Sequence, residues 1–338
     1  MIIKHKGTYK QLNTLSPLVR KVTWSGNRQQ VARKLIFDYA QDPRDPNLPN
    51  YVINVGETVF GYDEDGGLQF QGNVYAVEKD VQASHTVITA YDNLFVLSKS
   101  KTTHNYHEIT PEAVTKSICE ELGVKVGNIA ATNTPVSFVA SRKTGYQIIM
   151  AAYTEACKTL NKGLKDDDPN KKLYHPVMNG DALDVILKGT LIDGFEAHDM
   201  ANITHSSYKE SIEYIVNQIL VTDDKGNMTS ISRDDDSIKK YSMFQDVYKK
   251  NPNDNVQEQI DALMKKPERT GTMELLGDYK VKSSYSIKVT ESLFPAKFWI
   301  KSDTHTFEHG VHTMRIEAEF ENLMNEEKAE KEKTKNEG

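Results

Sequence analysis

The chain has 338 residues, of which 38% are hydrophobic and 27% charged, with a formal net charge of −6. This balance argues against a protein that wraps nucleic acid, and the two cysteines, Cys119 and Cys157, exclude a disulfide framework or a cysteine-rich zinc site. No apolar run approaches the about 20 residues that span a bilayer, and no signal peptide is visible, so we expect an intracellularly made protein without a membrane anchor.

Residues 1–103 are predicted to form a β-rich domain. The turn residues at 63–67 include two adjacent glycines, and they lie between apolar runs at 58–60 and 68–70, which favours a hairpin. Three prolines at 41–50 indicate a loop. Further β-branched and aromatic runs predict strands at 51–55, 74–77 and 86–91.

Residues 104–189 are predicted to combine helices with a hairpin. Thr110 and Pro111 are typical of a helix start, and an apolar stripe with period four follows them. A second helix is predicted over 144–161, and each helix carries one of the two cysteines, which we expect to be buried. A hairpin is predicted around 179–181.

The rest of the chain returns to a β pattern with one interruption. A hairpin is predicted from runs at 214–222 and 228–232, and residues 234–268 are predicted to be helical. Val256, Ile260, Leu263 and Met264 share one face of that helix. Residues 325–338 hold five Glu, four Lys and a single apolar residue, Ala329, and are expected to be disordered.

Strict alternation over residues 314–321 predicts a strand with one buried and one wet face. Met314, Ile316, Ala318 and Phe320 form the apolar face, and the polar face carries Arg315, Glu317, Glu319 and Glu321. Two interpretations of the polar row stay open. It is either an ordinary solvated face or the lining of a channel. In a channel surrounded by several copies of the chain, the equivalent strands would form a ring of carboxylates that repels DNA phosphates.

Other candidate sites are weighed against simpler interpretations. The cluster of His305, His309 and His312 invites zinc, but it flanks a glycine turn rather than one helix face. The acidic run at 63–66 lacks the glutamate of a calcium loop, and the aspartate runs at 166–168 and 234–236 lack the apolar surroundings of a catalytic carboxylate. We therefore expect no catalytic residue, metal or cofactor.

Two endings of β segments are similar in sequence. His85-Thr86 leads to Ala90-Tyr91-Asp92-Asn93-Leu94, and His312-Thr313 leads to Glu319-Phe320-Glu321-Asn322-Leu323. Chance similarity is a serious rival at this length. If the similarity reflects an internal repeat, it predicts two related β domains, one near each end of the chain.

Several stretches resemble one family, the XkdQ/YqbQ-type proteins of PBSX-like prophages. They are Val22-Thr23-Trp24-Ser25-Gly26 with a following segment that contains Arg33, the ending with Tyr91 and Asp92, the segment 237–245 around Tyr241, and the closing segment 303–314 with His305 and His312. Ser242 stands where the family usually has Gly. These stretches follow the family's order over nearly the whole chain.

The resemblance implies a baseplate hub of contractile phage tails and R-type bacteriocins, located in the particle and assembled in the bacterial cytoplasm. The implied fold is α+β, with two tube-like antiparallel β-barrel domains at 1–103 and at 190–233 with 269–324. A helix-plus-hairpin domain at 104–189 and a helical insertion at 234–268 accompany them. The implied assembly is a homotrimer whose partners are the tail tube protein, the spike protein and baseplate wedge proteins, with no membrane and no sequence-specific nucleic acid. The alternatives are a tail-associated peptidoglycan hydrolase and a wedge or adaptor protein of the same baseplate.

Overall fold

The computed structural model describes residues 1–7, 11–42, 44–49, 51–80, 84–165, 168–251 and 255–329. The chain divides into two compact units. The first unit comprises Met1–Ser206 and Thr272–Gly338, and the second comprises Ser207–Gly271. No helix in the described ranges is long and apolar enough to cross a bilayer.

The main sheet contains 13 strands within the described part of the chain. Its order is β14 (Ile203–Ser211), β18 (Glu268–Leu276), β21 (Val311–Glu319), β20 (Lys297–Glu308), β3 (Val19–Asn27), β4 (Lys34–Ala40), β7 (His85–Asp92), β6 (Leu68–Asp80), β5 (Thr58–Tyr62), β1 (Ile2–Lys6) and β2 (Leu12–Thr14). Off this path, β19 (Ser286–Thr290) pairs with β20 and with β13 (Leu191–His198).

Two halves of this sheet share one strand order. Within each half, the first two strands in sequence are neighbours, the third lies at the far side, and the fourth fits between the second and the third. These strands are β3, β4, β6 and β7 in one half and β14, β18, β20 and β21 in the other. The two similar sequence endings therefore lie on equivalent strands, β7 and β21.

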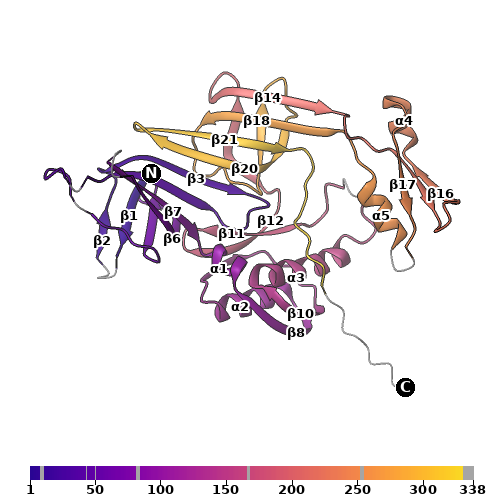
Figure 1. Ribbon diagram of the computed structural model, residues 1–338, viewed down its shortest axis with the longest axis horizontal. Coiled ribbons are helices and arrows are strands. Elements are labelled where there is room, and N and C mark those ends of the chain that lie inside the picture. Colours follow the sequence, from indigo (N-terminus) through magenta and orange to yellow (C-terminus); the bar gives the residue numbers. More distant parts are fainter. Residues whose placement is uncertain are drawn as a thin grey trace. The chain divides into compact units, whose positions relative to one another are not determined.

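The halves are joined through β3 and β20, which lie side by side in Figure 1. Their antiparallel register runs from Lys21 opposite Glu308 to Asn27 opposite Ser302. The family resemblance implies two barrels, whereas the described strands form one continuous sheet with ends at β14 and β2, so they do not close into a barrel. Residues 51–55 were predicted as a strand, but they lie outside the strands.

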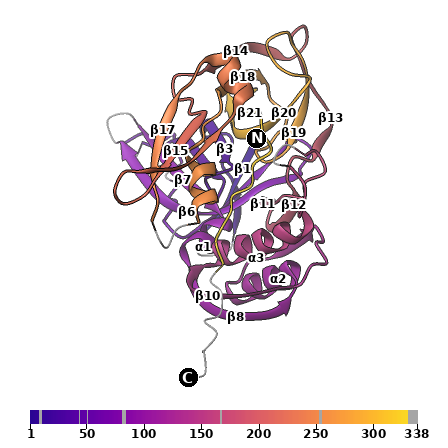
Figure 2. The same ribbon diagram turned by 90° about the vertical axis from the view of Figure 1, so that its right-hand side faces the viewer.

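A helical module follows β7. It contains α1 (Leu94–Lys99), β8 (Lys101–Ile109), α2 (Pro111–Glu121), β9 (Val126–Ile129), β10 (Val136–Thr144), α3 (Gly145–Leu160), β11 (Tyr174–Asn179) and β12 (Ala182–Leu187). Figure 2 shows α3 between α2 and the β11–β12 hairpin. Such a position explains why α3 is buried along most of its length.

The local signals in this module hold as predicted. Thr110 accepts a hydrogen bond from the N–H of Ala113 at the start of α2, and Thr144 with Gln147 forms a capping box at the start of α3. Both cysteines are buried, and burial raises the pKa of Cys119 to about 11 and that of Cys157 to about 12. They pack as small apolar side chains rather than as reactive thiols.

The second unit is a three-stranded sheet with two helices. Its strands have the order β16 (Met228–Arg233), β15 (Gln218–Thr222) and β17 (Gln245–Lys249), and its helices are α4 (Asp235–Tyr241) and α5 (Val256–Leu263). Ile260 of α5 packs on Ile219 and Val221, with Val256, Leu263 and Met264 around them, as the helical periodicity predicted. The unit is wider than the expected insertion at 234–268, and β17 interrupts the predicted helix.

The segment after β21 is hydrogen-bonded to other parts of the first unit. Asn325 donates to the carbonyl of Arg28 over 2.7 Å, and the N–H of Glu327 donates to the Thr154 hydroxyl over 3.2 Å. Disorder was expected from residue 325, so this expectation differs from the structure over 325–329. Residues 330–338 lie outside the described residues.

Candidate functional site

A buried ion pair lies where the two sheet halves join. Arg33, just before β4, directs both terminal nitrogens of its guanidinium at the Asp303 carboxylate of β20. Asp303 is 1% exposed and Arg33 is 8% exposed. The backbone N–H of Ser283 also donates to Asp303 over 2.6 Å. Bidentate pairing with an added backbone donor compensates the buried carboxylate, while the Nε of Arg33 has no hydrogen-bond partner among the described residues.

Aromatic rings extend this pair along the junction. Trp24 on β3 lies directly opposite His305 on β20, with ring centres 5.0 Å apart, and the Arg33 guanidinium lies 4.1 Å from the Trp24 ring centre. His305 is hydrogen-bonded through Nε2 to the carbonyl of Val281 and through Nδ1 to Nε2 of His312, 3.0 Å away. A carbonyl only accepts, so the Nε2 of His305 carries a proton and donates to Val281.

Two glycines make room for these side chains. A Cβ at Gly26 would collide with the Arg33 guanidinium, and a Cβ at Gly277 would collide with the ring of His312. Neither glycine is needed for a positive φ, since the close approach itself excludes a side chain. The glycine that ends the Trp24 motif therefore has a packing role.

Electrostatics in the junction follow from burial and charge. Burial raises the pKa of Asp303, but the Arg33 guanidinium and His305 outweigh it and hold that pKa well below its usual range. Burial, with His305 nearby, lowers the pKa of His312 to about 3, so this ring is neutral at pH 7. We name the group of Trp24, Arg33, Asp303, His305 and His312 the junction network.

The structure brings most of the predicted motif residues to the junction network. Asp92 is 2% exposed and accepts the backbone N–H groups of Arg33 and Leu94, each over 3.1 Å. Burial raises its pKa to about 7. Tyr91, next to it, stacks on Phe95 instead. Tyr241 belongs to α4 of the second unit.

The polar row on β21 is not uniform. Arg315 is exposed and Glu317 is half-buried, and these two form ion pairs with Glu274 and Lys301, respectively. Glu319 is 8% exposed and bridges Arg28, at 2.8 Å, and Lys188, at 3.2 Å. The expectation that all four residues face water or a channel is therefore wrong for Glu319. Glu321, beyond the strand, is exposed.

The remaining sequence candidates take structural positions. His309 lies in the β20–β21 turn with a φ of 53°, away from the His305–His312 pair. Asp63 closes its hairpin turn by accepting the N–H groups of Asp65 and Gly67, and Asp234 caps α4. Residues 166 and 167 lie outside the described residues. Among the described residues, no group of three His, Cys, Asp or Glu is arranged to hold a metal.

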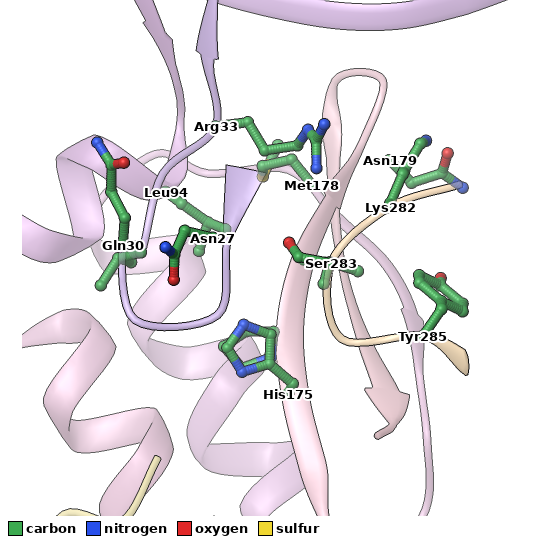
Figure 3. Close-up of a pocket in the computed structure, with 13 residues that line it drawn as sticks. Asn27, Gln30, Arg33, Leu94, His175, Met178, Asn179, Lys282, Ser283 and Tyr285 are labelled. Atoms are coloured by element: carbon green, nitrogen blue, oxygen red, sulfur yellow. The ribbon is translucent and has the colours of Figure 1, made fainter. Parts of the chain in front are cut away.

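A small cavity of about 90 Å³ lies beside the junction network in the first unit. Its walls come from the β3–β4 connection, from β11 and from the segment 282–285, and Figure 3 shows the His175 ring near the Ser283 and Asn27 side chains. Sequence reasoning missed this cavity, and it also missed Asp303 and Lys188 as partners. Asp303 stands in the closing motif two residues before His305, and that position was the available signal.

Comparisons with known proteins agree with this architecture. The uncharacterized protein YqbQ of Bacillus subtilis (strain 168) is 22% identical over 328 residues, covering 93% of this chain and 96% of that protein. The phage-like element PBSX protein XkdQ of the same strain is 22% identical over 333 residues, covering 94% and 97%. The 43 kDa tail protein of prophage MuSo2 from Shewanella oneidensis has a similar fold, with a TM-score of 0.68, 10% identity and coverage of 96% and 99%.

These relatives align over nearly the full length of both chains, so the similarity includes both sheet halves and the segments between them. A family model described as YQBQ-like matches residues 22–319, a range that begins in β3 and ends in β21. The chain belongs to the YqbQ-like family.

Proposed function

We propose that this chain is the structural hub of a contractile-tail baseplate, a homotrimer that links the central spike to the tail tube. The observation that carries the proposal is the repeated strand order, with the β3–β20 junction between its two copies. A chain that contains the same sheet unit twice presents six such units in a trimer. A threefold spike and a sixfold tube then meet on one ring.

The junction inside the chain predicts the junction between chains. The first part of β20 pairs with β19 and its later part, Ser302–Glu308, pairs with β3. The equivalent strand β6 pairs with β5 in its first part, and in the described residues no strand covers the side of residues 75–79 away from β7. At the other end of the sheet, β14 has only β18 as a neighbour in the strand order.

We infer that β14 of one subunit adds to residues 75–79 of the next, as β3 adds to β20 within the chain. Three such additions close a ring, and the tube-like β-barrel arrangement then belongs to the assembly. An open edge is a hazard in an isolated protein, and pairing within a permanent complex removes it. The name of the MuSo2 neighbour, a prophage tail protein, supports the same particle location.

Native mass spectrometry of the full chain purified with its spike partner tests the stoichiometry. Three copies are expected, whereas six copies would favour a wedge or adaptor protein, and one copy would contradict the ring. Zymography on cell walls tests the hydrolase alternative, for which we expect no clearing.

Hydrogen exchange tests the junction between subunits without any mutation. Amides of residues 75–79 and 203–206 should exchange slowly in the assembly and faster in the separated chain. Amides of β3 provide the matched control, because β20 protects them within one chain. Equal exchange at 75–79 in both states would refute this junction.

A further inference from the structure

The cavity beside the junction network contains a buried imidazole nitrogen without a protein partner. His175 is 4% exposed, and among the described residues its Nδ1 has no hydrogen-bond partner. Burial, with Lys188 and Arg28 nearby, lowers the pKa of His175 to about 3, so the ring is neutral and carries one N–H donor. Leaving a buried donor or acceptor unpaired destabilises the fold, so a ligand that pairs with it in the cavity would recover this energy.

A cation on the wall of the cavity has no matching carboxylate. Lys282 lines the cavity and has no carboxylate oxygen within 4 Å in the described ranges. Its ammonium lies 5.3 Å from the centre of the Trp24 ring. Burial and the nearby Arg33 lower the pKa of Lys282 to about 8, which leaves it mostly charged at pH 7.

The carboxylates nearest to Lys282 are engaged elsewhere. Asp303 is paired with Arg33, and Asp184 accepts from the N–H of Asn128 and from the Nδ2 of Asn179. Their charges act on Lys282 only from a distance. The cavity is therefore a donor-rich space with one cation that lacks a contact partner.

We propose that this cavity binds a small oxyanion, a free phosphate or a small carboxylate, with the Lys282 ammonium as its counter-ion. Ser283, Asn27 and His175 supply hydroxyl, amide and imidazole donors around the same space (Figure 3). A volume of about 90 Å³ is several times the about 10–15 Å³ that one water molecule needs, so an ion of this size fits. The bound ion would tie together the β3–β4 connection, β11 and the segment 282–285.

Thermal unfolding and titration calorimetry of the full-length chain test the site, with sodium phosphate or sodium acetate as the probe. At constant ionic strength set with sodium chloride, we expect a saturable rise in melting temperature that chloride alone does not give. Binding should weaken as the pH rises above about 8, because Lys282 then loses its proton. A rise that tracks only ionic strength would show that the cavity holds water, and it would overturn the proposal.

Variants of the lining residues test whether the anion binds in this cavity. Lys282→Met should weaken anion binding by about 10-fold or more, the loss typical of a charge-assisted hydrogen bond. Lys280→Met removes the same charge from an exposed position two residues away and should leave binding unchanged. If Lys282→Met does not fold, Ser283→Ala removes only a hydroxyl and should weaken binding several-fold. Unaltered binding in the folded Lys282 variant, or in the Ser283 variant, would place the anion elsewhere and refute this site.

Discussion

Asp303 connects three stretches of chain that are far apart in sequence. It lies on β20, pairs with Arg33 before β4, and accepts the N–H of Ser283. Asp303→Asn keeps the shape but leaves the Arg33 charge buried without its counter-ion. Removing one partner of a buried ion pair typically costs about 3–5 kcal/mol, so we expect a loss of this size in the free energy of unfolding, measured by urea denaturation.

Glu308→Gln is the matched control for Asp303→Asn. Glu308 lies on the same strand and pairs with Lys21 of β3, but both side chains are well exposed. Exposed pairs typically contribute about 0–1 kcal/mol, so this variant should unfold nearly as the wild type does. Equal losses in the two variants would show that the junction network does not depend on its buried charge.

Asp92 predicts an unusual pH dependence. Burial raises its pKa in the folded chain to about 7, above its ordinary value of 3.8, so the folded state keeps a proton that the unfolded state releases near pH 4. The unfolded state then binds fewer protons between these values, and this residue's contribution to stability falls as the pH rises from 4 to 7. Denaturation at several pH values should show that Asp92→Asn lacks this decline. A parallel decline in both proteins would assign it to other groups.

At the scale of elements, local chemistry determined what was predictable. Helix caps, turn glycines and alternation are properties of neighbouring residues, so α2, α3 and the β5–β6 and β11–β12 hairpins were predicted from sequence. The strand β17 was missed because its side chains are mostly exposed and carry little apolar alternation. The pairing of β3 with β20 and the cavity at 282–285 depend on residues more than 250 positions apart, and no local pattern specifies them.

Ser242 gives a test at the end of α4. It has a φ of 74° and a ψ of 173°, a conformation that residues other than glycine adopt at a cost of about 1–3 kcal/mol. Ser242→Gly should therefore stabilise the chain by about 1 kcal/mol, measured by denaturation and by slower hydrogen exchange in 235–249. Ser230→Gly on the exposed strand β16 should have the opposite sign. Loss of stability in both variants would mean that the Ser242 side chain contributes more than its backbone costs.

At the scale of the whole molecule, the polar row on β21 can be tested in the proposed assembly. Reversing the charge of Glu319 would place a cation beside Arg28 and Lys188. Such a variant would disrupt folding and would not test a surface charge. Glu317→Lys combined with Glu321→Lys reverses charges that are more accessible. If this face lines the channel of the proposed hub, the double variant should assemble normally and slow DNA release from a phage particle, because cations attract phosphates.

Glu120→Lys combined with Asp199→Lys is the control for this charge reversal. Both residues are exposed, and neither lies on β21. Release should then match the wild type, as measured by the rate at which DNA becomes accessible to nuclease. Unchanged release in the Glu317 and Glu321 variant, or side chains that point away from the axis of the assembled ring, would leave the row as a solvated surface.

The pairing of β3 with β20 also sets an order of events during synthesis. The partner of the strand Val19–Asn27 is Lys297–Glu308, so the ribosome must make most of the chain before the middle of the sheet can close. Until then the β3 edge stays exposed, with Trp24 and Arg33 of the junction network, and contacts this distant in sequence form slowly. A nascent chain stalled before residue 297 should therefore be prone to aggregation and sensitive to proteases. The chain would therefore be protected from aggregation only when its synthesis is complete. Folding of an autonomous first domain would not be enough.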